Sequence, residues 1–267
     1  MRMILPTLVA LALCSGSAVA TSIRYVPIPE RVARADLIVV GTVTEIEEKA
    51  IETPLYPGHP KSRHRIAVVK VSELLLGSEK KATELRIAFV AKEDQPNPGL
   101  WKGPPPLEKD SELLLFLRKH SSEDFYRLDG YFAAVKKGEG FAEALKETRG
   151  ACAVLADPGK ALKAKDPTDR MTAAWVLAVR YRMPPTDTPA GKATEEPIGA
   201  EESQAILEGL LALAEKDQWA FSAAVSLLNP KKEDGLEPPY SFDKAKTWVK
   251  EHAKSYRIKK LVTPPAK

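Results

Sequence analysis

The amino-acid sequence predicts an α+β fold, with a small antiparallel β-barrel or sandwich first and an α-helical bundle after it. Short apolar segments recur between residues 37 and 134 without helical segments between them, and loops rich in proline and glycine separate them. From about residue 141 the hydrophobic period becomes that of amphipathic helices. With 267 residues and 44% hydrophobic content, the chain is long enough for one or two ordinary domains.

Three strands are predicted in the first half of the β-rich region. Residues 37–46 begin as a continuous apolar, β-branched run and end in alternation, and Gly41 within them indicates a bulge or a sharp bend. The second strand is expected within residues 65–76 and the third within 84–91, because successive side chains there alternate between two faces. In the third strand Leu85, Ile87 and Phe89 share one face, and Arg86 and Ala88 share the other. Residues 47–63 between them predict an exposed loop or hairpin tip, since they hold several prolines.

The second half of the β-rich region has a long loop and further strands. Residues 92–109 contain three consecutive prolines at 104–106, which no central strand or helix interior accommodates. Residues 112–117 form an apolar run of strand length, and this predicts a central strand that is fully buried. Residues 125–134 predict one or two more strands around the turn dipeptide Asp129-Gly130.

Four helices are predicted in the second module. They are expected over residues 171–182, about 200–215, about 218–228 and from near Ser241, with Asp166 or Thr168 as the cap of the first and Ser241 as the cap of the last. Residues 186–200 are rich in Thr, Pro, Gly and Glu and predict a mobile linker. The residues after about 255 are basic, with a hint of alternation at Tyr256 and Ile258.

The first 20 residues have the pattern of a cleavable secretory signal peptide. Arg2 precedes an apolar run over residues 4–13, and Ala18-Val19-Ala20 is the small-x-small pattern that a signal peptidase accepts before Thr21. Pro6 and polar residues 15–17 break the run, which favours cleavage over a membrane anchor. We therefore expect a secreted or periplasmic protein with no transmembrane segment after cleavage. Lipidation at Cys14 stays open as the less favoured alternative, since Leu13 precedes it.

The expected organisation is a signal peptide over residues 1–20, a β-barrel domain over 21–140, a helical domain over 141–255 and a basic tail over 256–267. Cleavage removes Cys14 and leaves Cys152 unpaired. The formal net charge of +4 becomes +3 when Arg2 leaves, which is too small to imply nucleic-acid binding. Aromatic residues are sparse at 7%, so a base-stacking surface is also disfavoured.

Two family resemblances add to this pattern. The segment Ala35-Asp36-Leu37-Ile38-Val39-Val40-Gly41-Thr42-Val43, with residues 69–77 and 112–117, resembles strands of the netrin-like OB-fold modules, a group that includes tissue inhibitors of metalloproteinases. This resemblance implies an OB-like β-barrel. Inhibitors of that group use an N-terminal cysteine to chelate zinc, and because the expected N-terminus here is Thr21, that mechanism is not implied.

The second resemblance concerns the helical region. Asp166-Pro167-x-Asp169-Arg170, followed by Ala173-Ala174-x-x-Leu177, is similar to the opening of a HEAT-like helical repeat. Four helices give at most two repeat pairs, fewer than a free-standing solenoid usually needs, so we expect a short bundle beside the β module. The whole chain resembles exported bacterial β-plus-helical proteins of unknown function.

Several residues are candidates for metal or covalent chemistry. His59 and His64, with Glu47, Glu48 and Glu52 upstream, are candidate metal ligands, although a polar loop does not fix three or four ligands and solvated histidines are favoured. Cys152 is a candidate nucleophile, but its apolar neighbours favour a buried structural cysteine.

The remaining polar residues favour ordinary structural roles. His120 and His252 are expected to be solvated or hydrogen-bonded, and Glu123 and Asp124 to be solvated in a turn. The sequence holds no Gly-x-Ser-x-Gly elbow, phosphate-cradling glycine loop or dinucleotide fingerprint. No cofactor is therefore expected.

Candidate binding residues lie in the proline-rich loop and at basic positions. Trp101 and Lys102 could anchor a partner, and the alternative is that Trp101 plugs the open end of the barrel. Basic residues that could meet an anionic surface, or form a solvated face, are Lys136, Lys137, Lys160, Lys163, Lys165, Arg257, Lys259 and Lys260.

The leading hypothesis is an exported, non-enzymatic binding or structural module of the periplasm or cell envelope, with an unidentified protein or envelope component as partner. The alternatives are a metal-dependent or cysteine-based hydrolase, and a protein that binds a polyanion or polysaccharide. The sequence leaves the oligomeric state open.

Overall fold

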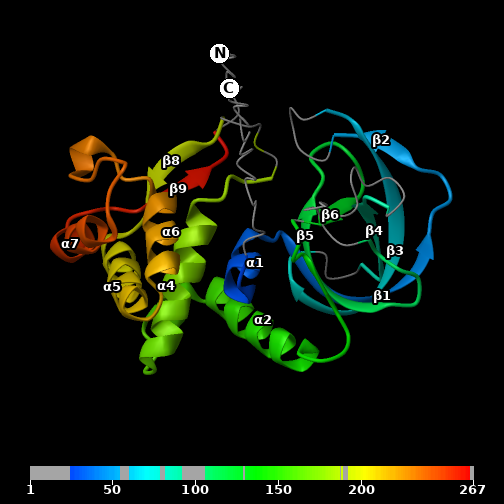
Figure 1. Ribbon diagram of the computed structural model, residues 1–267, viewed down its shortest axis with the longest axis horizontal. Helices are drawn as coiled ribbons and strands as arrows, with labels where there is room; N and C mark the ends of the chain where they lie inside the picture. Colours follow the sequence, from blue (N-terminus) through cyan, green and yellow to red (C-terminus); the bar gives the residue numbers. More distant parts are fainter. Residues whose placement is uncertain are drawn as a thin grey trace, which may run out of the picture.

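The computed structural model describes residues 25–54, 60–78, 82–91, 106–128, 130–186, 188 and 192–264. Within these residues the fold is mixed α+β, with a seven-stranded sheet and, later in the chain, a group of helices (Figure 1). The expected α+β class is confirmed. The expected signal peptide lies outside the described residues, and so do Cys14, His59, Trp101 and Lys102.

The seven strands of the main sheet coincide with most of the apolar segments of the sequence. They are β1 (Leu37–Ile46), β2 (Ile51–Thr53), β3 (Ser62–Leu76), β4 (Glu84–Phe89), β5 (Glu112–Lys119), β6 (Tyr126–Leu128) and β7 (Ala134–Lys136). Five of these strands pair in a circuit that returns to its start. β1 is antiparallel to both β3 and β5, β3 is antiparallel to β4, β4 is parallel to β6, and β6 is antiparallel to β5.

β1 and β5 are buried on both of their faces, which explains their continuous apolar runs. Alternate residues of the two strands, such as Val39 and Leu115, contact the inner faces of β3 and β4. The residues between them, such as Ile38 and Phe116, belong to a second core cluster that includes the helices. The full burial expected for residues 112–117 is confirmed for 113–117, while Glu112 at the strand start is half-buried.

A short helix before the sheet, α1 (Ile28–Arg34), joins the sheet to the helical region (Figure 1). Its Arg31 donates hydrogen bonds to the carbonyl oxygens of Val26 and Phe132, and its guanidinium lies 5.8 Å from the centre of the Phe116 ring. Burial lowers the pKa of Arg31, because desolvation disfavours the charged form. The sequence patterns did not predict this helix, whose stability comes from contacts with α2, α4 and β5.

The helical region confirms the predicted helices and adds two. The helices are α2 (Phe141–Ala156), α3 (Pro158–Leu162), α4 (Pro167–Tyr181), α5 (Ala200–Lys216), α6 (Gln218–Leu228) and α7 (Phe242–His252). Asp166 and Ser241 cap α4 and α7 as expected, each accepting a hydrogen bond from a backbone N–H of the first turn. α2 and α3 were not predicted, because small residues such as Ala144, Thr148 and Ala151 form the buried face of α2 and give little hydrophobic contrast.

The segment expected to be a linker contains a strand. β8 (Thr194–Pro197) pairs antiparallel with β9 (Lys259–Val262), which lies in the expected basic tail. Ile258 just before β9 is fully buried, and Arg182 joins the ribbon through a hydrogen bond to the carbonyl oxygen of Lys259 and an ion pair with Glu195. Composition suggested mobility here, and the order comes from pairing between segments about 65 residues apart.

Two connections between strands can be compared with expectation. The region 47–63 agrees with the hairpin alternative, because β2 pairs antiparallel with the start of β3. β6 and β7, which flank Gly130, do not form a hairpin with each other. Each pairs with a different part of β5, since Leu117 faces Leu128 of β6 while Leu115 faces Ala134 of β7.

The β1 bend gives a testable prediction about stability. The register of β1 on β3 shifts between Val40 and Gly41, and a Cβ at Gly41 would lie 2.6 Å from Val69 Cγ1 and 2.7 Å from the carbonyl oxygen of Lys70. Gly41→Ala should therefore lower the free energy of unfolding by about 1–3 kcal/mol, measured by urea denaturation. Gly150→Ala is the control, since nothing lies within 4 Å of a Cβ there, and it should change stability by less than about 1 kcal/mol, in the stabilising direction.

Candidate functional site

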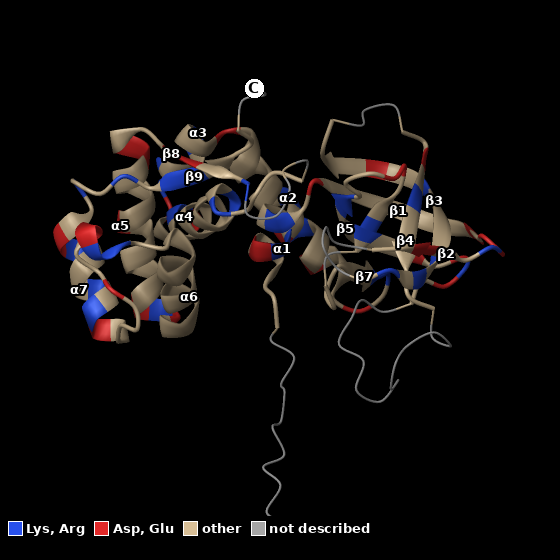
Figure 2. Cartoon of the chain, turned by 90° about the horizontal axis from the view of Figure 1, so that it is seen from above, with Lys and Arg blue, Asp and Glu red and all other residues tan. Residues whose placement is uncertain are grey.

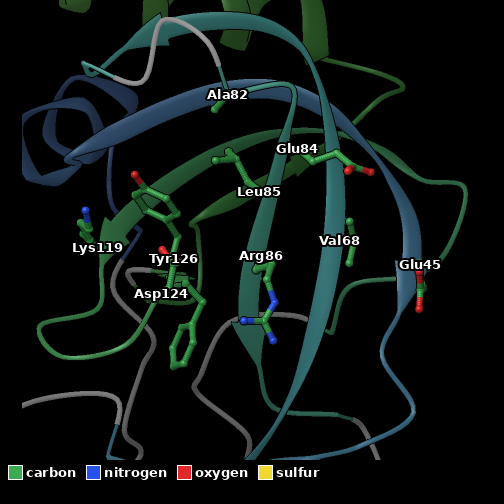
Figure 3. A pocket seen from close by; sticks show the side chains of 10 residues that line it. Glu45, Val68, Ala82, Glu84, Leu85, Arg86, Lys119, Asp124 and Tyr126 are labelled. Atoms are coloured by element: carbon green, nitrogen blue, oxygen red, sulfur yellow. The ribbon is translucent and has the colours of Figure 1, made fainter.

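A polar groove of about 570 Å³ lies on the sheet where β4 and β6 diverge (Figure 3). These two strands are parallel, and they pair at two positions, Ile87 with Tyr126 and Ala88 with Arg127. Because the strands separate beyond these pairs, side chains of both sheet faces reach the groove. Its lining residues are Glu45, Val68, Ala82, Glu84, Leu85, Arg86, Lys119, Asp124, Phe125 and Tyr126.

Strand register brings these residues together from distant parts of the chain. Val68 of β3 pairs with Arg86 of β4, and Ile87 next to Arg86 pairs with Tyr126 of β6. In Figure 3, Arg86 lies at the centre, with Asp124 and Tyr126 on one side and Val68 on the other. The groove therefore combines an aromatic wall with charged groups of both signs.

Arg86 is held in place by a carboxylate at the edge of the groove. Its Nε lies 2.8 Å from Glu47 Oε1 and its Nη2 lies 3.0 Å from Oε2, which is a two-point pair. The hydrogen bond to Glu47 raises the pKa of Arg86, with a further electrostatic contribution from Asp124. Because Glu47 neutralises Arg86, the carboxylates Glu45, Glu84 and Asp124 outnumber the remaining cation of the groove, Lys119.

His120 fixes the turn that carries Asp124 and Phe125 into the groove. Its Nδ1 accepts hydrogen bonds from the backbone N–H groups of Ser122 and Glu123, so its Nε2–H donates to the carbonyl oxygen of Pro54 at 2.8 Å. The His120 and Phe125 rings lie 4.7 Å apart. His120 is therefore a buried, hydrogen-bonded histidine, one of the two roles expected for it. Asp124 is exposed in this turn, as expected, and it also lines the groove.

The residues suggested for metal binding are not gathered in the described part of the chain. His64 is buried at the start of β3, with its Nε2 2.9 Å from Ser62 Oγ. Glu47 is engaged with Arg86, and Glu52 lies on β2. Among the described residues, no three His, Cys, Asp or Glu side chains form a group that could hold a metal ion.

Cys152 and His252 lie in the helical region. Cys152 is buried in α2, and this burial raises the pKa of its thiol to about 12. His252 stacks on Trp248, with ring centres 5.5 Å apart, and its Nδ1 lies 2.9 Å from the Trp248 carbonyl oxygen. The structural burial expected for Cys152 is confirmed, and the thiol lacks the thiolate character that a nucleophile needs.

The candidate basic residues lie on several elements: Lys160, Lys163 and Lys165 line one hollow beside α2 and α3, whereas Lys136 belongs to β7 and Lys259 to β9. Lys136 and Lys137 form ion pairs of 2.8 and 2.7 Å with Glu108 and Glu112. Figure 2 shows basic and acidic residues interspersed over both the sheet and the helical part. Such pairs of exposed charges fit the solvated face that the sequence suggested as one of two interpretations.

In the part of the chain that is described, no helix has the length and apolar character needed to cross a membrane.

Comparison of the chain with protein-family models and with curated proteins found no match in either set. The assignment of the candidate site therefore depends on its geometry.

Sequence patterns did not single out the groove residues as a site. Arg86 stood out only as an outward residue between inward-facing Leu85 and Ile87, which is the ordinary pattern of a half-buried strand. Tyr126 and Asp124 lay in a segment predicted as strand and turn. The available signal was a charged residue on the outer face of a strand, and many exposed strands share it.

The burial of Cys152 predicts slow thiol chemistry in the folded protein. At about pH 8, the native thiol should react with a disulfide reagent such as DTNB roughly a thousandfold more slowly than the thiol of the unfolded chain, because its raised pKa leaves little thiolate. Absorbance measurements of the reaction with and without guanidinium check this. Equal rates in the two states would show that Cys152 is accessible and ionised.

Proposed function

We propose that this chain is an exported, non-enzymatic binding module whose groove between β4 and β6 takes a neutral, hydroxyl-rich ligand, such as a short oligosaccharide of the cell envelope. The observation that carries the proposal is the composition of the groove lining. It has an aromatic wall at Tyr126, and its carboxylates are in excess because Glu47 neutralises Arg86. Carboxylates accept hydrogen bonds from sugar hydroxyl groups, and the tyrosine ring offers an apolar surface with a polar end.

The pairing of the sheet supports an OB-like β-barrel as the scaffold. The circuit β1-β3-β4-β6-β5 returns to β1 and has one parallel pair, β4 with β6, in an otherwise antiparallel arrangement. OB-folds are five-stranded Greek-key barrels that bind oligonucleotides and oligosaccharides on the face of their second and third strands and on nearby loops. The groove includes Val68 of β3 and Arg86 of β4, which are the second and third strands of the circuit.

The charge of the groove distinguishes between oligonucleotides and oligosaccharides, the two ligand classes that OB-fold faces bind. Nucleic acids bring a phosphate at every nucleotide, and binding proteins neutralise these phosphates with Lys and Arg. Glu45, Glu84 and Asp124 would repel them. The volume of about 570 Å³ lies within the range of ordinary small-molecule sites, so a short neutral oligosaccharide fits both the size and the charge.

The helical region is proposed as a short α-helical bundle that supports the barrel. α4 packs against α5, and α5 packs against α6 and α7. The similarity to HEAT-like repeats stays a prediction. Export to the periplasm or the extracellular space is proposed from the pattern of residues 1–20.

The ligand class can be tested by calorimetric titration with neutral oligosaccharides, chitotriose and maltotriose among them, and with oligo-dT as a comparison. We expect binding of at least one neutral oligosaccharide that changes little with salt, and none of oligo-dT. Asp124→Ala should weaken binding about tenfold, as expected for losing one hydrogen bond to a charged group. Glu143→Ala removes an exposed carboxylate of α2 that lines no part of the groove, and binding should stay unchanged.

Results of two kinds would contradict this proposal, one with oligo-dT and one with the oligosaccharides. One is tight oligo-dT binding that falls steeply with salt, which would favour a polyanion ligand instead. The other is oligosaccharide binding that Asp124→Ala and Glu143→Ala weaken equally, or no oligosaccharide binding at all.

Export gives a separate prediction. Expression in a bacterium with a periplasm should yield a chain that begins at Thr21, because the signal peptidase cleaves after Ala18-Val19-Ala20. Mass spectrometry of the purified protein measures the N-terminus. Ala20→Arg should block cleavage and leave the precursor, while the control Lys49→Ala, well beyond the cleavage site, should have no effect on processing. An uncleaved wild-type chain in the cytoplasm would overturn the proposed export.

A further inference from the structure

A second hollow, which we name the junction pocket, lies where the sheet meets the helices. It has a volume of about 220 Å³. Four cationic side chains from four different elements line it, together with one carboxylate. Its lining residues are Arg34 at the end of α1, Asp36, Arg118 of β5, Arg180 and Tyr181 of α4, Met183, Pro184, Pro185, and Lys260 and Leu261 of β9.

The acidic groups near the junction pocket leave part of this positive charge uncompensated. Asp36 Oδ2 accepts hydrogen bonds from the Thr186 hydroxyl at 2.5 Å and from the Lys119 backbone N–H at 3.1 Å, and lies 3.7 Å from Arg118 Nε. Arg34 pairs with Glu30 at 2.8 Å. The single carboxylate of Asp36 therefore serves several donors. Besides Arg34, Lys260 has an acidic partner of its own, since its Nζ lies 4.0 Å from Glu196 Oε2.

Arg118 and Arg180 are the cations with the weakest compensation. The side chain of Arg118 is 11% exposed, yet its Nη2 makes only long hydrogen bonds of 3.3 Å, to the Pro184 carbonyl oxygen and to Thr186 Oγ1. Its buried Nε has no hydrogen-bond partner among the described residues. Arg180 donates to the carbonyl oxygens of Ala33 and Ala35 and, within the same described ranges, forms no ion pair. Both guanidinium groups thus retain capacity for a charge-assisted hydrogen bond.

Helix ends explain only part of this cluster. α1 and α4 both end at the junction pocket, and basic side chains are favourable beside the carbonyl groups of a helix C-terminus. This accounts for Arg34 and Arg180. Arg118 and Lys260 come from strands, so their convergence on the same small space has no such reason. Like charges gathered in a partly buried pocket repel one another, and a bound anion would relieve that repulsion.

We propose that the junction pocket binds a phosphate group, either as free phosphate or as a phosphate monoester. Guanidinium groups match the oxygen geometry of phosphate, and two of them with a lysine can surround a dianion. Pro184, Pro185 and Leu261 add apolar walls that suit the small organic part of a monoester. The proposal is independent of the oligosaccharide groove, which has the opposite charge balance.

The test is calorimetric titration of the full exported chain with sodium phosphate and, separately, with glycerol 3-phosphate, at constant ionic strength set by sodium chloride. Saturable binding of either probe is expected, together with a rise in thermal unfolding temperature that chloride does not give. Tighter binding of glycerol 3-phosphate assigns the monoester as the ligand, and tighter or equal binding of phosphate assigns the free ion.

Variants of the cations decide whether the binding occurs in the junction pocket. Arg180→Gln should weaken phosphate binding about tenfold, as expected for losing a charge-assisted hydrogen bond. Lys260→Gln, whose side chain is 43% exposed, should weaken it by a smaller factor and decides the question if Arg180→Gln does not fold. Arg149→Gln is the matched control, because Arg149 is 54% exposed, pairs with Glu73 and lines no part of the pocket.

Two outcomes would overturn the proposal. One is that neither probe binds more than chloride does. The other is binding that folded Arg180→Gln and Lys260→Gln leave unchanged, or that Arg149→Gln weakens as much. Asp124→Ala should leave phosphate binding intact, so failure here is distinguishable from failure of the oligosaccharide proposal.

Discussion

Burial of β1 and β5 on both faces is the constraint from which the remaining architecture follows. Successive residues of a strand point to opposite faces, so Val39 and Leu115 pack inside the sheet while Ile38 and Phe116 pack against the helices. A shift of one residue in register would exchange the two sets. The pairing of β1 with β5 therefore determines two things at once: which side chains fill the interior of the sheet, and which side chains α1, α2 and the other helices pack against.

The end of β5 links the two candidate sites. Arg118 lines the junction pocket and the next residue, Lys119, lines the groove, since adjacent residues of a strand face opposite sides. Asp36 contacts both of these residues: it accepts a hydrogen bond from the Lys119 backbone N–H and forms an ion pair with the Arg118 side chain. The sites differ in charge, with carboxylates in excess in one and guanidinium groups in the other. They therefore suit different ligand classes, although β5 contributes a residue to each of them.

Much of the fold could be predicted wherever local pattern and tertiary packing agree. β4 alternates cleanly, and α4 and α7 begin at the capping residues Asp166 and Ser241. Prediction failed where long-range contacts supply the stability. α1 is seven residues long and is held by packing against α2, α4 and β5, α2 buries mostly small side chains, and the β8 and β9 ribbon pairs segments far apart in sequence.

Sequence patterns were enough for the α+β class, for the strand and helix segments with strong periodicity, and for the burial of Cys152 among apolar neighbours. They drew attention to Trp101, Lys102 and His59, which lie outside the described residues, and to His64, which is buried at the start of β3. Only the folded structure shows which polar residues come together at a site. The groove collects side chains from several strands, and the junction pocket collects them from strands and helices. No local pattern encodes this, because the register and packing between distant segments set which residues become neighbours.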